Sequence, residues 1–257
     1  MLRPYSLPFV ASFTVAMLLL AACGDSDAQL DTSEPWDLVW ISDSMGEQVA
    51  YRWADQIEEA EGVEVRVHDY VIGFLSMEKA QQMITNDATI REEAADAEII
   101  VVYGNNSDTG PADYSGTCHT PSPTPRDPPN AYTQADFAPY GDALRGIYDV
   151  IFELRAGQPT VIRAFDVFNG MIADWREAGI EPECTAFWDS ESEVLREAAD
   201  DYGVAMASFY DEFNVPDHDE DPREKGYISV DGFHASTEGV AVQAEILHAL
   251  GYEPIVP

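Results

Sequence analysis

A serine lies where an apolar segment ends and a helical pattern begins. Ser44 stands in the sequence DSMG (43–46), after the apolar stretch 36–42 and at the start of the helical pattern 46–60. It could simply cap the helix, because serine is a preferred N-cap. It could also be a nucleophile, because backbone N–H groups at a helix N-terminus favour developing negative charge. A nucleophilic serine also needs a base, so the remaining sequence has to decide between the two.

One of the five histidines has the position that a base needs. The other four are expected within a strand, in a proline-rich loop, in an acidic loop and in the last helix: His68, His119, His218 and His248. His234 precedes the last helical pattern, and Asp231 lies three residues before it. A D-x-x-H loop lets the carboxylate fold back and orient the imidazole. Because the chain is rich in aspartate, this spacing is weak evidence alone; its value lies in its place before a closing helix.

Two further positions could stabilise an oxyanion. Asn106 follows the third apolar stretch in GNNS (104–107), and its amide could donate to a developing oxyanion, although glycine and asparagine also favour ordinary turns. Asn105 is adjacent, so the donor could be this residue instead of Asn106. Gly73 follows the second stretch, where a glycine lets an N–H approach a substrate closely; turn geometry is the alternative. Their order along the chain, more than any single residue, favours a catalytic site.

Alternating strand and helix patterns must position these residues. Apolar stretches predict strands at 36–42, 63–71, 97–104, 159–167 and 203–209. Helical patterns lie near 46–60, 76–95, 139–156, 169–178, 190–202 and 236–250. This alternation predicts a parallel sheet with right-handed crossovers. The candidate residues follow strands or precede the last helix, so they should gather at the carboxyl edge, where open α/β folds bind ligands.

The stretch 110–137 interrupts the alternation. It carries six prolines and is too proline-rich for a helix or a central strand. A loop this long in a compact domain is usually functional or disordered. We therefore predict a proline-rich insertion that starts at the carboxyl edge of the sheet.

The N-terminus has the pattern of an export signal. Residues 1–22 contain one basic residue, Arg3, and then an apolar run that is too short to span a bilayer comfortably. The run ends in LAAC (20–23), which resembles a bacterial lipobox, a signal in which the cysteine is lipidated and becomes the new N-terminus. An ordinary secretory signal with a chance cysteine is the alternative. We expect an exported lipoprotein anchored through Cys23, an acidic tether over 23–35, and one domain over 36–257.

The cysteine count agrees with export. Three cysteines are present, and a lipidated Cys23 leaves Cys118 and Cys184. An oxidising compartment favours a disulfide between them. Two separate free thiols are the alternative.

The charge excludes some partners. The formal net charge is −35, and removal of residues 1–22 deletes only Arg3, leaving 12 basic against 48 acidic residues, or −36. Such a surface repels phosphate backbones and anionic headgroups, so we expect no nucleic-acid partner and membrane contact only through the lipid anchor. The acidic run 217–224 lacks the glycine and the alternating spacing of a calcium loop. We therefore expect no metal and no cofactor.

Taken together, these residues resemble the SGNH hydrolases, also called GDSL-type esterases and lipases. The resemblance covers about residues 36–250 and implies a flavodoxin-like three-layer α/β/α sandwich with a five-stranded parallel sheet. The positions that match the family's blocks are the nucleophile Ser44, the glycine donor Gly73, the asparagine donor Asn106, the orienting Asp231 and the base His234. Two positions depart from the family: Ser42 replaces the usual glycine before Asp43, and Ser107 replaces the usual aspartate. Neither change removes a catalytic side chain, but Ser42 puts the loop geometry in doubt.

The resemblance implies ester hydrolysis through an acyl-enzyme. His234 would take the Ser44 proton, Asp231 would orient the imidazole, and the N–H groups of Ser44 and Gly73 with the Asn106 amide would hold the oxyanion. A small acyl ester, a lipid or an O-acetylated carbohydrate is the expected substrate class. Acyl transfer to a cell-envelope glycan is a rival reading, and a catalytically silent binding lipoprotein is another. Aromatic residues near the expected rim could bind a substrate or only pack: Phe74, Tyr103, Tyr114, Phe187, Trp188 and Phe233.

Overall fold

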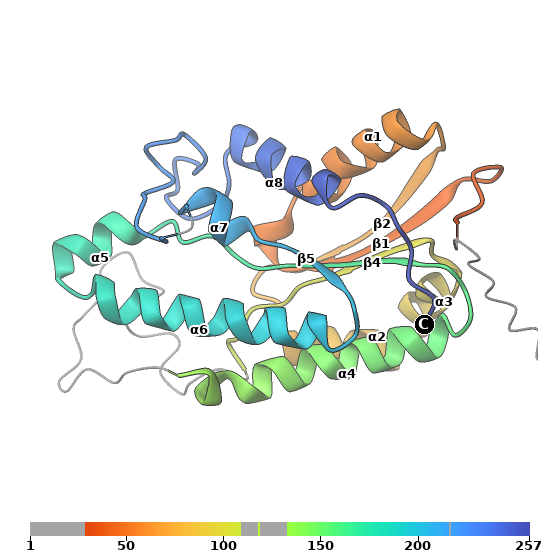
Figure 1. Ribbon diagram of the computed structural model, residues 1–257, viewed down its shortest axis with the longest axis horizontal. Coiled ribbons are helices and arrows are strands. Elements are labelled where there is room, and N and C mark those ends of the chain that lie inside the picture. Colours follow the sequence, from red (N-terminus) through yellow and green to blue (C-terminus); the bar gives the residue numbers. More distant parts are fainter. Residues whose placement is uncertain (1–28, 109–117, 119–132, 216) are drawn as a thin grey trace, which may run out of the picture.

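The computed structural model describes residues 29–108, 118, 133–215 and 217–257 (Figure 1). The predicted signal sequence, Cys23 and most of the proline-rich insertion lie outside the described residues. The last residues of the insertion, Gln134–Phe137, form a 3-10 turn, η2. Within the described part of the chain, no helix is long and apolar enough to cross a membrane.

Five parallel strands form the centre of the domain. They are β1 (Trp36–Ser42), β2 (Val65–Val71), β3 (Ile99–Val102), β4 (Val161–Phe165) and β5 (Ala205–Ala207), in the order β2-β1-β3-β4-β5. Every residue of β3 and β4 is buried, as expected for strands covered on both faces. Each predicted strand is present: β1 has the predicted bounds, and the other four are shorter by two to four residues where their ends run into loops.

Helices cover both faces of the sheet. They are α1 (Val49–Glu61), α2 (Met77–Asn86), α3 (Ala88–Asp96), α4 (Ala138–Leu154), α5 (Ile172–Ala178), α6 (Glu181–Asp200), α7 (Phe209–Phe213) and α8 (Thr237–Ala249). In Figure 1, α1 and α8 pack together on one side of the sheet, and α2, α4 and α6 form the layer on the other. This three-layer α/β/α arrangement confirms the predicted fold class.

Two helices differ from the expected pattern for local reasons. The predicted helix 76–95 is broken at Asp87, whose carboxylate accepts hydrogen bonds from the N–H groups of Thr89 and Ile90 and so caps α3. The predicted helix 190–202 begins earlier, at Glu181. Pro182 lies in its first turn, where no intrahelical N–H is required, so the proline does not end the helix.

The core beneath the carboxyl edge of the sheet is aromatic. Phe165 at the end of β4 stacks on Tyr103, Trp40 and Phe209, with ring centroids 4.8, 5.5 and 4.9 Å apart. All four side chains are buried. Offset aromatic pairs contribute about 0.5–1.5 kcal/mol each beyond their buried area. The loops that follow β1, β3 and β4 therefore pack on a well-ordered aromatic cluster.

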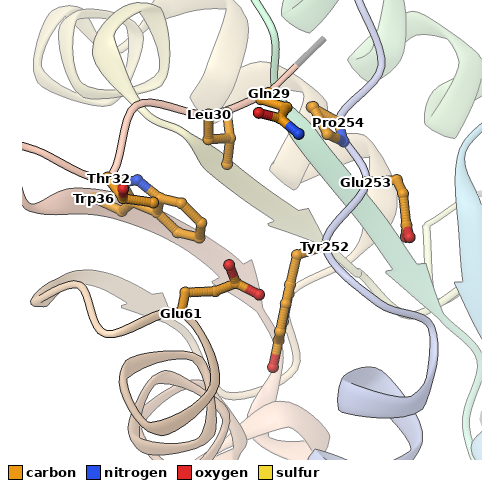
Figure 2. A pocket seen from close by; sticks show the side chains of 8 residues that line it. All are labelled: Gln29, Leu30, Thr32, Trp36, Glu61, Tyr252, Glu253 and Pro254. Carbon is orange, nitrogen blue, oxygen red and sulfur yellow. The ribbon is translucent and has the colours of Figure 1, made fainter. Parts of the chain in front are cut away.

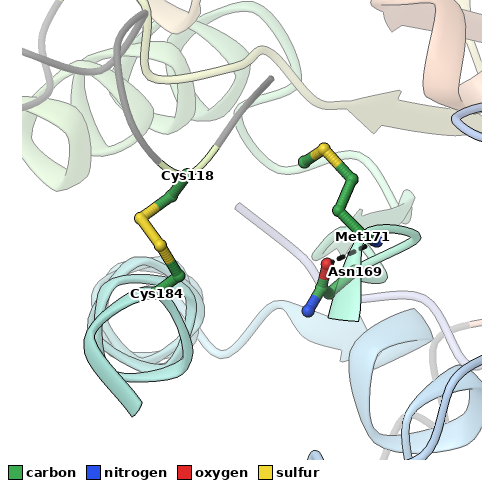
Figure 3. The surroundings of a disulfide bond; sticks show 4 residues. All are labelled: Cys118, Asn169, Met171 and Cys184. Atoms are coloured by element: carbon green, nitrogen blue, oxygen red, sulfur yellow. Dashed lines mark hydrogen bonds between the residues drawn. A yellow bond between two sulfur atoms is a disulfide. The ribbon is translucent and has the colours of Figure 1, made fainter. Parts of the chain in front are cut away.

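A disulfide joins Cys118 to Cys184 in the first turn of α6 (Figure 3). The two Cα atoms are 5.3 Å apart, and both residues are buried. Figure 3 also shows the loop after β4, where the N–H of Met171 donates to Asn169 Oδ1. The disulfide links Cys118 of the proline-rich insertion covalently to α6.

Loss of this disulfide should lower the free energy of unfolding by up to about 4 kcal/mol, because 66 residues separate the cysteines and the bond restricts the unfolded chain. For a domain of this size that is a fall in melting temperature of roughly 8–16 °C. Calorimetry of Cys184→Ser and of the Cys118→Ser/Cys184→Ser double variant tests this. The two variants should have the same melting temperature, and a reductant should not change it. Equal melting temperatures for the wild type and the double variant would contradict the prediction.

Candidate active site

Ser44, His234 and Asp231 form a hydrogen-bonded chain although 190 residues separate the serine from the histidine. Ser44 Oγ lies 3.0 Å from His234 Nε2, and His234 Nδ1 lies 2.8 Å from Asp231 Oδ2. Ser44 opens the η1 turn (Ser44–Gly46) after β1, and the other two lie in the loop before α8. All three line one cavity of about 300 Å³. This arrangement can deprotonate a serine and stabilise the resulting imidazolium.

Asp43, and not Ser44, is the residue that caps the turn. Its carboxylate Oδ1 accepts a hydrogen bond from the N–H of Met45 at 2.9 Å. The Ser44 hydroxyl is thereby left for His234. The capping alternative for this serine is therefore excluded by the local geometry.

The Asp231 carboxylate is fixed by four donors. Oδ1 accepts from the Ser229 hydroxyl and from the N–H groups of Phe233 and His234, and Oδ2 faces the imidazole. Slight burial acts to raise the pKa of Asp231, but the donors outweigh it and hold the pKa well below its usual range. The carboxylate stays ionised at neutral pH, which favours a proton on Nδ1 of His234 and leaves Nε2 to accept one from Ser44.

The hydroxyl of Ser42 makes hydrogen bonds within the core. Ser42 is fully buried, its hydroxyl accepts a hydrogen bond from Trp40 Nε1 at 2.8 Å, and it donates to the carbonyl of Asp43. A Cβ added at Gly46 would lie 2.6 Å from the Ser42 hydroxyl, so a small residue is required at 46. The serine that departs from the family pattern thus satisfies a buried indole.

Gly73 lies in an exposed turn next to the serine loop. The N–H of the preceding Ile72 donates to the carbonyl of Ser42, which places the turn beside the segment that carries Ser44. A Cβ added at Gly73 would meet no atom within 4 Å. The adjacent Phe74 is 83% exposed and has a positive φ of 58°. No hydrogen bond joins Gly73 to Ser44 among the described contacts.

The two asparagines have different environments. Asn105 Nδ2 donates to Asp43 Oδ2 at 3.1 Å, and Asn105 Oδ1 accepts from the N–H of Ser107. The side chain of Asn106 is fully buried, and neither of its polar atoms has a hydrogen-bond partner among the described residues. Leaving a buried amide unsatisfied costs about 1–3 kcal/mol, so such groups are rare in folded proteins. Asn106 is the amide with unused hydrogen-bonding capacity.

A second, smaller cavity adjoins the first. It has a volume of about 30 Å³ and shares Met45 with the cavity of Ser44. Burial raises the pKa of Asp43, which lines it, to about 6. Burial, and then the charges of Asp43 and Asp166, raise the pKa of Glu191, which also lines it, to about 8. Sequence reasoning missed Glu191, although its spacing from Phe187 and Leu195 puts it on the buried face of α6.

The aromatics expected at the rim divide between three environments. Tyr103, Trp188 and Phe233 line the small cavity. Phe187 packs edge-to-face on Phe137 in the core, and Tyr114 lies outside the described residues. Phe74, as noted, faces solvent.

A larger cavity lies at the opposite edge of the sheet (Figure 2). It measures about 670 Å³, and Figure 2 shows Trp36 from the start of β1, Glu61 from the end of α1 and Tyr252 around it. Its full lining is Gln29, Leu30, Thr32, Trp36, Glu61, Tyr252, Glu253 and Pro254. None of these is a histidine that could act as a base. Size alone therefore does not locate the reactive site.

Three other histidines have partners away from the serine. These are Asp37 and Glu93 for His68, Asp189 and Asp211 for His218, and Tyr252 for His248. His119 lies outside the described residues. In the part of the chain that the structure describes, no group of three acidic, histidine or cysteine side chains could hold a metal ion.

No protein-family model and no curated protein matches the sequence. Solved structures do match. A lipase from a goat rumen metagenome is 17% identical with a TM-score of 0.63, over 84% of this chain and 98% of that one. A lipase/acylhydrolase from Enterococcus faecalis is 14% identical with a TM-score of 0.54, over 86% and 98%. A GDSL-like lipase from Bacteroides thetaiotaomicron is 11% identical with a TM-score of 0.50, over 83% and 86%.

Identities this low establish the fold and not the activity. The chain has the α/β/α fold of GDSL/SGNH lipases and acylhydrolases, as the sequence predicts. What it does has to be argued from its own residues.

The buried Glu191 should make stability depend on pH. A carboxyl whose pKa is raised to about 8 in the fold binds a proton more tightly there than in the unfolded chain, so stability is lost as pH rises from about 4.5 to 8. As the pH rises from 5 to 8.5, the free energy of unfolding of the wild type should therefore fall by roughly 3–6 kcal/mol more than that of Glu191→Gln. Denaturant unfolding at the two pH values measures both. Glu193→Gln, at an exposed position of the same helix, should follow the wild type. Parallel pH profiles for the wild type and Glu191→Gln would contradict this.

Proposed function

We propose that the protein is a serine esterase that hydrolyses carboxylic esters through an acyl-enzyme. The observation that carries the proposal is the hydrogen-bonded chain from Ser44 through His234 to Asp231. It lies at the carboxyl edge of the sheet, where ligands bind in open α/β folds. A catalytically silent binding protein would have no need of an ionised aspartate aligned on a histidine that faces a serine.

Each residue has a role in the proposed reaction. Ser44 Oγ attacks the ester carbonyl while His234 Nε2 takes its proton, and the imidazolium is stabilised by Asp231. His234 then gives the proton to the departing alcohol, which leaves an acyl-serine. Water attacks the acyl group with His234 again as the base, and the carboxylic acid is released. Every proton passes through Nε2 of one histidine.

The oxyanion needs donors near Ser44. We propose the N–H groups of Ser44 and Gly73 together with the side-chain amide of Asn106. The amide is the best supported of the three, because it is buried and has no hydrogen-bond partner among the described residues. One such donor is typically worth about 10²–10³ in turnover.

Ser44→Ala should reduce ester hydrolysis by at least about 10⁴-fold, because the nucleophile is removed. Ser42→Ala is the matched control. It should keep kcat within a few-fold and lose about 1 kcal/mol of stability, since the Trp40 indole loses its acceptor. Initial rates on 4-nitrophenyl acetate measure both. Loss of activity in Ser42→Ala with retention in Ser44→Ala would show that the wrong serine has been assigned.

Asn106→Ala should lower kcat about 10²–10³-fold with little change in KM, because its donor acts on the transition state. Asn105→Ala should have a smaller effect on kcat, since that amide already binds Asp43. Steady-state kinetics of the two variants separate the roles. A large kcat effect confined to Asn105→Ala would move the donor one residue earlier.

We also propose that the protein is exported and anchored to a membrane through lipidated Cys23. The proposal rests on the sequence LAAC (20–23), on the apolar run before it and on the polar stretch 23–35. The large negative charge gives the mature chain little attraction for anionic headgroups, so the lipid would be its attachment.

Cys23→Ala should move the protein from the membrane fraction to the soluble fraction without changing kcat/KM on a soluble ester. The reason is that the cysteine lies well before β1 and outside the catalytic domain. Fractionation of the native host, followed by immunoblotting and an esterase assay, measures both effects. Equal membrane retention of the variant would exclude the anchor at this residue.

A further inference from the structure

The small cavity beside Ser44 has the composition of a binding pocket with one polar end. Its apolar wall consists of Met45, Val167, Phe168, Met171, Trp188 and Phe233. Trp188 Nε1 donates to the carbonyl of Val167, which leaves the indole face as apolar surface. Asp43, Tyr103, Asn105 and Glu191 carry the polar groups of the lining. Met45 lines both this cavity and the cavity of Ser44, Asp231 and His234, so the two cavities adjoin.

Glu191 is the unexplained group in this cavity. Glu191 is only 8% exposed, and its Oε2 atom has no hydrogen-bond partner among the described residues. The next residue, Ser192, donates to Asp166 and is not available to it. A buried carboxyl oxygen without a partner is costly, so a ligand that supplied one would gain binding energy.

The charge state of Glu191 decides what it can bind. Burial and the nearby carboxylates of Asp43 and Asp166 favour the protonated form, with a pKa of about 8. A neutral carboxylic acid can donate one hydrogen bond and accept others. It therefore suits an uncharged hydroxyl group, and the surrounding acids disfavour an anionic one.

We propose that this cavity is the acyl subsite of the enzyme and that Glu191 makes it selective for a short acyl chain ending in a hydroxyl group. The inference rests on the proposed esterase function and names its substrate class. A volume of about 30 Å³ holds about two or three water-sized groups. The chain that fits extends about three non-hydrogen atoms beyond the carbonyl carbon, as in a 3-hydroxypropanoyl ester.

The wild-type enzyme tests the proposal with three ethyl esters. Ethyl 3-hydroxypropanoate and ethyl butanoate have acyl groups with the same number of non-hydrogen atoms, and monoethyl malonate carries a negative charge. We expect kcat/KM to be at least about tenfold higher for the hydroxy ester than for the butanoate, because a site built to bind a hydroxyl leaves its polar group unpaired with the analogue. The malonate should be the slowest. A hydroxy-to-butanoate ratio of one or less would overturn the proposal.

Two variants assign the preference to Glu191. Glu191→Leu should remove or reverse the ratio, whereas Glu191→Gln, which keeps an uncharged hydrogen-bonding group, should retain most of it. Ethyl acetate, whose acyl group lacks the hydroxyl, is the reference substrate: Glu191→Leu should lower kcat/KM more for the hydroxy ester than for ethyl acetate. An unchanged ratio in Glu191→Leu would refute the role. If that variant does not fold, a lost preference in Glu191→Gln refutes it instead.

The esters also separate this inference from the function it rests on. If ethyl acetate is hydrolysed by the wild type but not by Ser44→Ala, the esterase proposal holds, and the ratio alone judges the acyl subsite. If none of these esters nor any other is hydrolysed, both proposals fail together. Glu193→Gln, at its exposed position on α6, should match the wild type on all substrates.

Discussion

The buried carboxylate of Asp43 holds the reactive edge of the sheet together. One oxygen caps the turn after β1 through Met45, and the other receives the amide of Asn105 from the loop after β3. Because Asp43 does the capping, the hydroxyl of Ser44 is free to face His234. Burying this carboxyl raises its pKa to about 6, so the fold keeps a charge where desolvation opposes it. The aromatic stack around Phe165 supports the loops that carry Asp43 and Asn105.

The same charge shapes the neighbouring cavity. Asp43 and Asp166 both favour the protonated form of Glu191, so an acid in a very acidic protein becomes a neutral donor. Two carboxyls with opposite tasks are thus separated by their surroundings: Asp231 is kept ionised by four donors, and Glu191 is kept neutral by burial. Environment, and not residue type, assigns these roles.

Much of the fold could be predicted from the sequence, because its strands are short apolar stretches and its helices have clear periodicity. The two misplaced helix boundaries came from single residues, the cap at Asp87 and the tolerated Pro182, whose effects depend on local geometry. Ser44 was identifiable from its place after the first strand, and Asp231 and His234 from their spacing together with their place before the last helix. Glu191 was not: its spacing from Phe187 and Leu195 puts it on the buried face of α6, but the sequence does not show which groups that face packs against. The choice between Asn105 and Asn106 was open for a similar reason: adjacent residues in a loop can exchange roles through a small backbone change.

Reaction with a fluorophosphonate probe tests the central claim most directly, because only a serine activated by a base attacks phosphorus rapidly. The folded protein should acquire one adduct, and peptide mass spectrometry should place it on Ser44. Heat-denatured protein and Ser44→Ala should acquire none. A folded protein that gives no adduct, or that carries it on a residue other than Ser44, would contradict the account.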